Sequence, residues 1–114
     1  MGESKRKVFL FGAERCGHGD DDLGFQILAD LLEALADRED RPAAIICWNT
    51  AVRMVAQGSP LLSRLKRLEE NGVTILAGRS CLINLGIEDE VAVGKAATMG
   101  EILDLILHND VISL

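Results

Sequence analysis

The chain has 114 residues, enough for one domain and too few for two, so we expect a single domain over residues 1–114. Hydrophobic residues make up 48% of the chain, which excludes a disordered protein. The formal net charge of −6 argues against nucleic acid and against membranes as partners, because both attract positive surfaces.

The N-terminal stretch MGESKRKVFLFGAE combines a basic start with an apolar run, as a signal peptide does. Its apolar run of about six residues is shorter than the roughly 7–15 of a signal peptide. No stretch approaches the roughly 18 apolar residues that span a bilayer. We therefore expect a cytoplasmic protein, whose three cysteines serve metal binding, thiol chemistry or burial rather than a disulfide framework.

The first half of the chain alternates short apolar runs with one long amphipathic stretch. The run KVFLFGA (7–13) predicts a strand, and PAAIICWN (42–49) predicts a second one. Between them, DDDLGFQILADLLEALADR (20–38) has apolar residues at helical spacing and acidic residues at its start, where they suit the positive end of a helix dipole. The stretch TAVRMVAQG (50–58) is expected to be a loop or a short helix.

The second half continues this alternation. SPLLSRLKRLEENG (59–72) predicts a helix, with Ser59 as its cap and Pro60 in the first helical position. Its apolar residues recur at helical spacing, and Asn-Gly supplies the stop. The predicted third, fourth and fifth strands are VTILAG (73–78), EVAVG (90–94) and DVISL (110–114).

Near the C-terminus, TMGEILDLIL (98–107) predicts a last helix, with Thr98 and Glu101 at capping-box spacing. Strands that are apolar almost throughout and alternate with amphipathic helices indicate an α/β fold, with a parallel sheet covered on both faces. In such sheets the chemistry lies beyond the carboxyl ends of the strands. The loops expected at that edge are 13–22, 49–58, 78–82 and 94–98.

Cys81 stands at the junction of two apolar runs, directly after the predicted third strand. Ser80 is the expected N-cap of a short helix over 81–85 that ends at Gly86, which puts Cys81 in the first helical position. Free amides and the helix dipole there stabilise a thiolate, and Arg79 adds to this if it folds back. The alternative is a small buried thiol that fills space beside the sheet.

The first loop, GAERCGHGDDDLG, has glycines whose spacing matches neither the dinucleotide fingerprint nor the P-loop. Its aspartates are expected to be solvated charges at a helix start, with Mg²⁺ binding as the alternative. Zinc binding by Cys16, His18 and Cys81 would lack a clear fourth ligand. His18 is either a base toward Cys81 or simply exposed. Cys47 is expected in the core, and His108 is expected to have a structural role at a helix end.

Three stretches, in this order, resemble the DsrE-like superfamily: GHGDDDLGFQILADLLEAL, then WNTAVRMVAQGSPLLSRLKRLEENGVTILAGRSCLINLGI, then VGKAATMGEILDLIL. Within that superfamily they are similar to the C-terminal domain of the YedF-like proteins, which are sulfurtransferase-like and associated with selenium metabolism. The shared features include the acidic helix start after paired glycines and the cysteine after the third strand. The likeness spans residues 8–107.

The resemblance implies a three-layer α/β/α fold with a five-stranded parallel sheet in the order 4-3-2-1-5, assembled as a homo-oligomer (trimer, dimer or hexamer). It also implies a persulfide carrier, and Cys81 occupies the matching position. We expect neither a cofactor nor a metal. YedF-like proteins often have C-G-T-C where this chain has Gly78-Arg79-Ser80-Cys81, so Cys16 is the candidate resolving thiol. Their N-terminal Cys-Pro domain has no counterpart here, so we expect the sulfur donor and acceptor to be other proteins.

Two functions remain in competition, and whether the protein is an enzyme stays open between them. The first is a sulfur or selenium carrier, in which Cys81 holds the persulfide while Arg79 and Ser80 stabilise the anionic sulfur. The second is a binding or assembly subunit without transfer activity. A nucleotide-binding role for the glycine loop is disfavoured by its aspartates. The residues expected to bind the substrate are Gly17, His18, Gly19 and Asn49.

Overall fold

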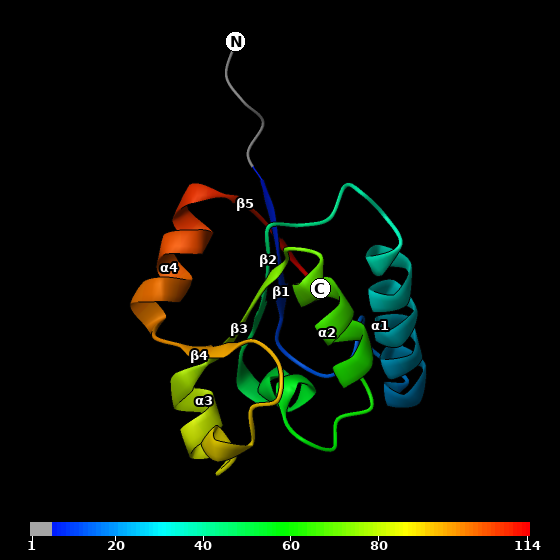
Figure 1. Cartoon of the computed structure of the whole chain (residues 1–114). Helices are drawn as coiled ribbons and strands as arrows, with labels where there is room; N and C mark the ends of the chain where they lie inside the picture. Colours follow the sequence, from blue (N-terminus) through cyan, green and yellow to red (C-terminus); the bar gives the residue numbers. More distant parts are fainter. Residues whose placement is uncertain (1–5) are drawn as a thin grey trace.

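A computed structural model describes residues 6–114, which form five parallel strands in one sheet with the order β4-β3-β2-β1-β5 (Figure 1). Each neighbouring pair of strands is parallel. The predicted α/β fold and strand order are therefore confirmed. The strands are β1 (Lys7–Phe11), β2 (Ala44–Cys47), β3 (Thr74–Gly78), β4 (Lys95–Ala97) and β5 (Asp110–Ser113).

Helices lie on both faces of the sheet, which makes three layers (Figure 1). α1 (Asp21–Ala36) and α2 (Leu62–Glu70) cover one face, and α4 (Met99–His108) covers the other. The short α3 (Arg79–Asn84) and the 3₁₀ helix η1 (Asn49–Val55) lie at the carboxyl ends of the strands. A second 3₁₀ turn, η2 (Glu88–Glu90), precedes β4. Across residues 6–114, no helix has the length and apolar content needed to cross a bilayer.

α1 begins where the aspartate cluster supplies its cap. The Asp20 side chain accepts a hydrogen bond from the Leu23 N–H, and two further aspartates lie in the first turn. The helix then turns Leu28, Leu32 and Leu35 into the core. The acidic run thus starts the helix, as the sequence predicts.

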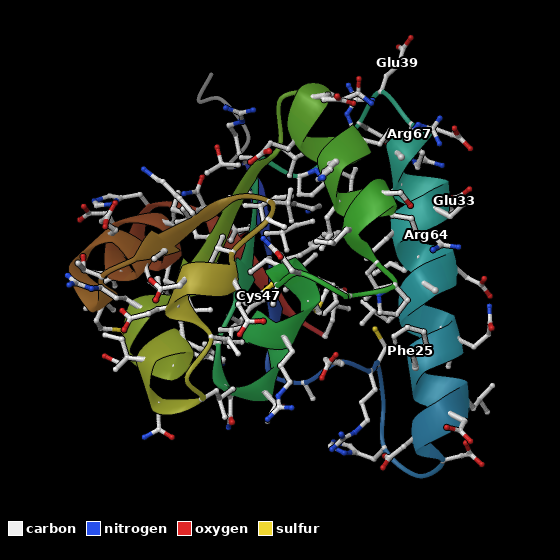
Figure 2. All side chains as sticks on the ribbon, turned by 60° about the horizontal axis from the view of Figure 1, so that its bottom comes forward. Phe25, Glu33, Glu39, Cys47, Arg64 and Arg67 are labelled. Carbon is white, nitrogen blue, oxygen red and sulfur yellow. The ribbon has the colours of Figure 1, made fainter. Side chains whose placement is uncertain are left out.

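The core has two parts, one on each face of the sheet. The larger part joins β1–β3 to α1, α2 and η1, and the smaller joins the same strands to α4. On the larger side, the Arg64 guanidinium reaches from α2 toward Glu33 on α1, with 3.4 Å between Nε and the carboxylate oxygen (Figure 2). The opposite face is closed chiefly by Ile102 of α4, which is 1% exposed.

The predicted fourth strand at 90–94 is wrong, because β4 is Lys95–Ala97. Val91 instead makes an antiparallel bridge to Ala56, and Val93 is buried beside the larger core. The chain turns at Gly94, whose φ is +69°, before it enters the sheet. These valines are apolar because they cover the core from a loop, so their pattern imitates a strand.

Helix starts agree with the sequence at α4 and differ at α2. Thr98 and Glu101 form the predicted capping box: the Thr98 side chain accepts from the Glu101 N–H, and the Glu101 side chain accepts from the Thr98 N–H. At α2, the Ser59 hydroxyl accepts from the Leu61 N–H in a turn, and the helix begins only at Leu62. Pro60 therefore precedes the helix instead of opening it.

Candidate functional site

Cys81 lies on α3, which follows β3 without an intervening loop. Gly78 occupies the N-cap position, and no side chain caps the helix. Ser80 is therefore inside the helix rather than at its cap, and Cys81 is the third helical residue rather than the first. The predicted end of the helix is confirmed, since Gly86 follows it with a φ of +72°. A hydrogen-bond donor to the Cys81 sulfur must therefore come from outside the first turn of the helix.

That donor is the backbone of Asn49. Its N–H donates a hydrogen bond to Cys81 Sγ, with 3.1 Å between nitrogen and sulfur. Asn49 has a φ of +54° and is the only non-glycine residue with a positive φ among those described. The left-handed region is strained for most residues and is tolerated best by glycine, asparagine and aspartate. The residue whose N–H bonds to the sulfur therefore also has a left-handed backbone conformation.

Gly78 permits this close approach between β3, α3 and the end of β2. A Cβ atom at Gly78 would lie 3.3 Å from Cys81 Sγ and 3.6 Å from the Trp48 Cβ. A contact of 3.3 Å is tight, so a larger residue would displace the sulfur. Glycine at the end of β3 thus leaves room for the sulfur beside the strand.

Cys81 borders a pocket of about 510 Å³ between α3 and α4, beyond the carboxyl ends of β2, β3 and β4. Its polar lining comes from the end of β2 and from α3. Its apolar lining comes mainly from β4 and α4. Arg79 is the one residue of this lining with a basic or acidic side chain apart from the Cys81 thiol. The lining residues are Trp48, Asn49, Gly78, Arg79, Ser80, Cys81, Asn84, Leu85, Ala97, Met99 and Ile102.

The other two cysteines have different surroundings. Cys47 is fully buried (Figure 2), and burial raises the pKa of its thiol to about 12. Its predicted place in the core is confirmed. Cys16 is half-buried against the larger core, and burial raises the pKa of its thiol as well. All three cysteines are free thiols.

The first loop lies outside the pocket lining. Gly17, His18 and Gly19 were expected to bind the substrate, but they do not line the pocket, and all three are exposed. Cys16 does not line it either; its N–H bonds to the Gly24 carbonyl. Within residues 6–114, no three His, Cys, Asp or Glu side chains gather closely enough to hold a metal ion. Cys16, His18 and Cys81 are thus not assembled as a ligand set.

Of the expected site residues, the structure brings Arg79, Ser80, Cys81 and Asn49 together. It adds an apolar wall that sequence reasoning missed. Trp48 had a usable signal, because it follows β2 at the carboxyl edge. The wall residues on β4 and α4 had none, because only the strand order brings them beside α3. The lining residues that were not expected are Trp48, Gly78, Asn84, Leu85, Ala97, Met99 and Ile102.

No protein-family model and no curated protein matches the chain. Solved structures do match it over nearly their whole length. The ychN protein from E. coli has a TM-score of 0.73 at 17% identity, over 96% of this chain and 99% of that one. The protein of unknown function BT1422 from Bacteroides thetaiotaomicron has a TM-score of 0.68 at 21% identity, over 96% and 95%.

A third structure, the protein of unknown function MTH1491 from Methanobacterium thermoautotrophicum, has a TM-score of 0.70 at 19% identity. It is matched over 100% of its length and 97% of this chain. Identities this low establish shared architecture and nothing about activity. The chain therefore has the α/β fold of the ychN protein, with its five parallel strands in the order 4-3-2-1-5.

Proposed function

We propose that the protein carries sulfur as a persulfide on Cys81. The observation that supports this most strongly is the hydrogen bond from the Asn49 N–H to Cys81 Sγ at the edge of an open pocket. A donor aimed at the sulfur favours an anionic sulfur over a neutral one. Cys81 is half-buried, so a sulfur donor has access to it. Arg79, at the same pocket, adds a positive charge.

The transfer needs no external oxidant. The Cys81 thiolate attacks the terminal sulfur of a donor persulfide, the donor's S–S bond breaks, and a new S–S bond forms at Sγ. The donor leaves as a thiolate and takes a proton from water. Delivery repeats the step in reverse: an acceptor thiolate takes the terminal sulfur, and Cys81 leaves as the thiolate that the Asn49 N–H stabilises.

The sequence resemblance to YedF-like proteins extends the proposal to selenium. A persulfide and its selenium analogue have similar charge and geometry at the transferred atom. The same hydrogen-bond donors of the site therefore serve both. We also propose a cytoplasmic location, which three free thiols favour, because reducing compartments preserve them. The proposed macromolecular partner is a protein that exchanges sulfur with Cys81.

The decisive experiment is to incubate the protein with an excess of inorganic polysulfide and to measure the intact mass. We expect one added sulfur atom, removed by dithiothreitol, in the wild type and in Cys47→Ser. We expect none in Cys81→Ser. Mild oxidation tests the resolving-thiol hypothesis, because a Cys16–Cys81 disulfide would form in the wild type only if the two thiols approach each other. Cys16→Ser, which cannot form this disulfide, is the comparison. Sulfur that stays on the protein in Cys81→Ser would overturn the proposal.

The protein has a second candidate role, as a binding or assembly subunit without transfer. The favouring observation is a row of exposed apolar side chains on α4, formed by Met99, Leu103 and Leu107. They are four residues apart, so they lie along one side of the helix. We propose that a second copy of this chain covers this α4 row, because a row on one helix can pair with itself across a two-fold axis. A protein that self-associates but never accepts sulfur would have this second role.

A further inference from the structure

The pocket beside Cys81 is much larger than the sulfur atom that the proposed carrier would move. Its volume is about 510 Å³, which is in the range of roughly 300–1,000 Å³ that is usual for small-molecule sites. A water-sized ion takes only about 30 Å³. The pocket therefore has room for the body of an organic molecule beside the reactive sulfur.

The chemistry of the two walls differs. The wall from the end of β2 and α3 carries the Asn49 backbone, Arg79 and Cys81. The opposite wall from β4 and α4 carries Ala97, Met99 and Ile102, which offer no hydrogen-bonding side chain. A ligand that satisfies both walls has an apolar body and a polar end that contains the sulfur.

The charge of the lining residues indicates which polar group the ligand carries. Arg79 is exposed on the pocket, and it makes no ion pair within residues 6–114. The lining holds no acidic residue, although the whole chain has a net charge of −6. An unpaired guanidinium beside a pocket without carboxylates favours an anionic ligand, and it pairs with a carboxylate in two-point geometry.

We propose that the pocket binds a small organic persulfide with an apolar body and a carboxylate, and that this molecule donates sulfur to Cys81. This rests on the proposed carrier function and specifies its donor. The Cys81 thiolate attacks the outer sulfur of R–S–SH, the bond between the two ligand sulfurs breaks, and Cys81–S–SH forms. R–S⁻ leaves and is protonated by water. The partner protein then serves as the acceptor of the sulfur.

Binding is tested without reaction, by means of the single tryptophan of the chain. Trp48 lies in the pocket lining, so its fluorescence reports occupancy. The probe is the S-methyl ether of mercaptophenylpropionic acid, which cannot transfer sulfur. We expect a saturable fluorescence change in the wild type and at least about tenfold weaker binding in Ala97→Leu, which fills the pocket. Ala96→Leu, on the same strand and outside the lining, is the matched control and should bind like the wild type.

A second variant keeps the test valid if Ala97→Leu does not fold. The wild type should bind the carboxylate probe roughly fivefold or more tightly than the corresponding carboxamide. Arg79→Gln should lose this preference. Arg53→Gln, an exposed arginine on η1 outside the lining, should keep it. No saturable signal, or equal binding by Ala97→Leu and Ala96→Leu, overturns the proposal.

A sulfur-transfer experiment distinguishes failure of the small-molecule donor proposal from failure of the carrier function. The hydropersulfide of the same acid should load Cys81 about tenfold more slowly in Ala97→Leu than in the wild type, while inorganic polysulfide loads both alike. Loading by polysulfide but no effect of Ala97→Leu on the organic donor rejects the small-molecule donor and leaves the carrier standing. Saturable binding with no loading by either donor rejects the carrier. Loading only by a protein persulfide also rejects the small-molecule donor.

Discussion

At the scale of single residues, the contact between Asn49 and Cys81 combines two features that a sequence cannot show together. Asparagine is one of the few residues tolerated at positive φ, and the N–H of this same residue donates to the sulfur 32 positions further along the chain. Sequence alone placed both residues at the carboxyl edge of the sheet. Their contact depends on the register of β2 against β3, which only the fold defines.

Substitutions at Asn49 should separate the backbone from the side chain. Asn49→Gly keeps both the N–H and the left-handed conformation, so the alkylation rate of Cys81 at neutral pH should stay within about twofold of the wild type. Asn49→Val disfavours positive φ and misdirects the N–H. The rate should then fall about tenfold, because a hydrogen bond to a charged group is worth roughly 1.5–3 kcal/mol. Equal rates in the two variants would show that the amide does not stabilise the thiolate.

Cys47 should make the stability of the protein depend on alkaline pH. Burial raises the pKa of its thiol from 9.0 to about 12, so between these values the folded state keeps a proton that the unfolded chain has released. The free energy of unfolding should therefore fall as pH rises through that window, by up to about 1.4 kcal/mol per pH unit from this group. Urea unfolding at a series of pH values measures the slope.

The control for this pH dependence is Cys47→Ala, which removes the thiol and leaves every other titrating group in place. Its slope between pH 9 and 12 should be smaller than that of the wild type. Parallel curves would mean that Cys47 ionises while it is still in the core. Below pH 9 the free energies of unfolding of the two proteins should differ by a constant amount, which is the cost of the small cavity that Cys47→Ala leaves.

At the scale of elements, the entry into β4 depends on Gly94. A Cβ there would lie 2.5 Å from the Ile75 carbonyl oxygen, and the backbone has a φ of +69°. Gly94→Ala should lower the free energy of unfolding by about 3 kcal/mol, since it adds a backbone clash to left-handed strain. Gly58→Ala is the matched control, because Gly58 has a φ of +88° and open space around it, and it should cost about 1 kcal/mol. Urea denaturation compares the two, and equal losses would refute the clash.

The same element explains why one strand was mispredicted and the others were not. Apolar runs identify β1, β2 and β3 because these strands are buried on both faces, whereas β4 is a three-residue edge strand of sequence KAA. Nothing in that short run distinguishes it from a loop. The valines before it, which cover the core from outside the sheet, carry the stronger signal. The capping box of α4 was predictable because both of its residues are local in sequence.

At the scale of the whole molecule, the layers followed from the alternation of strands and helices, while the pocket did not. Its walls come from three separate stretches of the chain, 48–49, 78–85 and 97–102, and each stretch looks ordinary alone. Only the order 4-3-2-1-5 brings the start of α4 beside α3 (Figure 1). The fold could thus be predicted from hydrophobic patterns that are local in sequence. The site could not, because it is formed by residues that are distant in sequence and close only in the fold.

The proposed self-association through the α4 row is tested at the scale of the whole molecule. Leu107 is 69% exposed and Leu103 is 43% exposed, so Leu103→Asp and Leu107→Asp should leave the fold intact and yield monomers. Leu23→Asp, at a side chain 59% exposed on α1, is the control and should leave the assembly unchanged. Light scattering after size exclusion measures the mass. A monomeric wild type at high protein concentration would contradict the proposed assembly.

Ile102 belongs at once to the buried layer beneath α4 and to the lining of the pocket. An occupant that reaches this part of the pocket therefore also touches the residue that anchors this helix to the sheet. By linkage, an occupant that binds more tightly when α4 is packed on the sheet makes the opening of α4 less favourable, and a loosened helix weakens the binding of that occupant to the same degree. Protection of the α4 amides from exchange with deuterated solvent is thus a direct gauge of whether the pocket is filled.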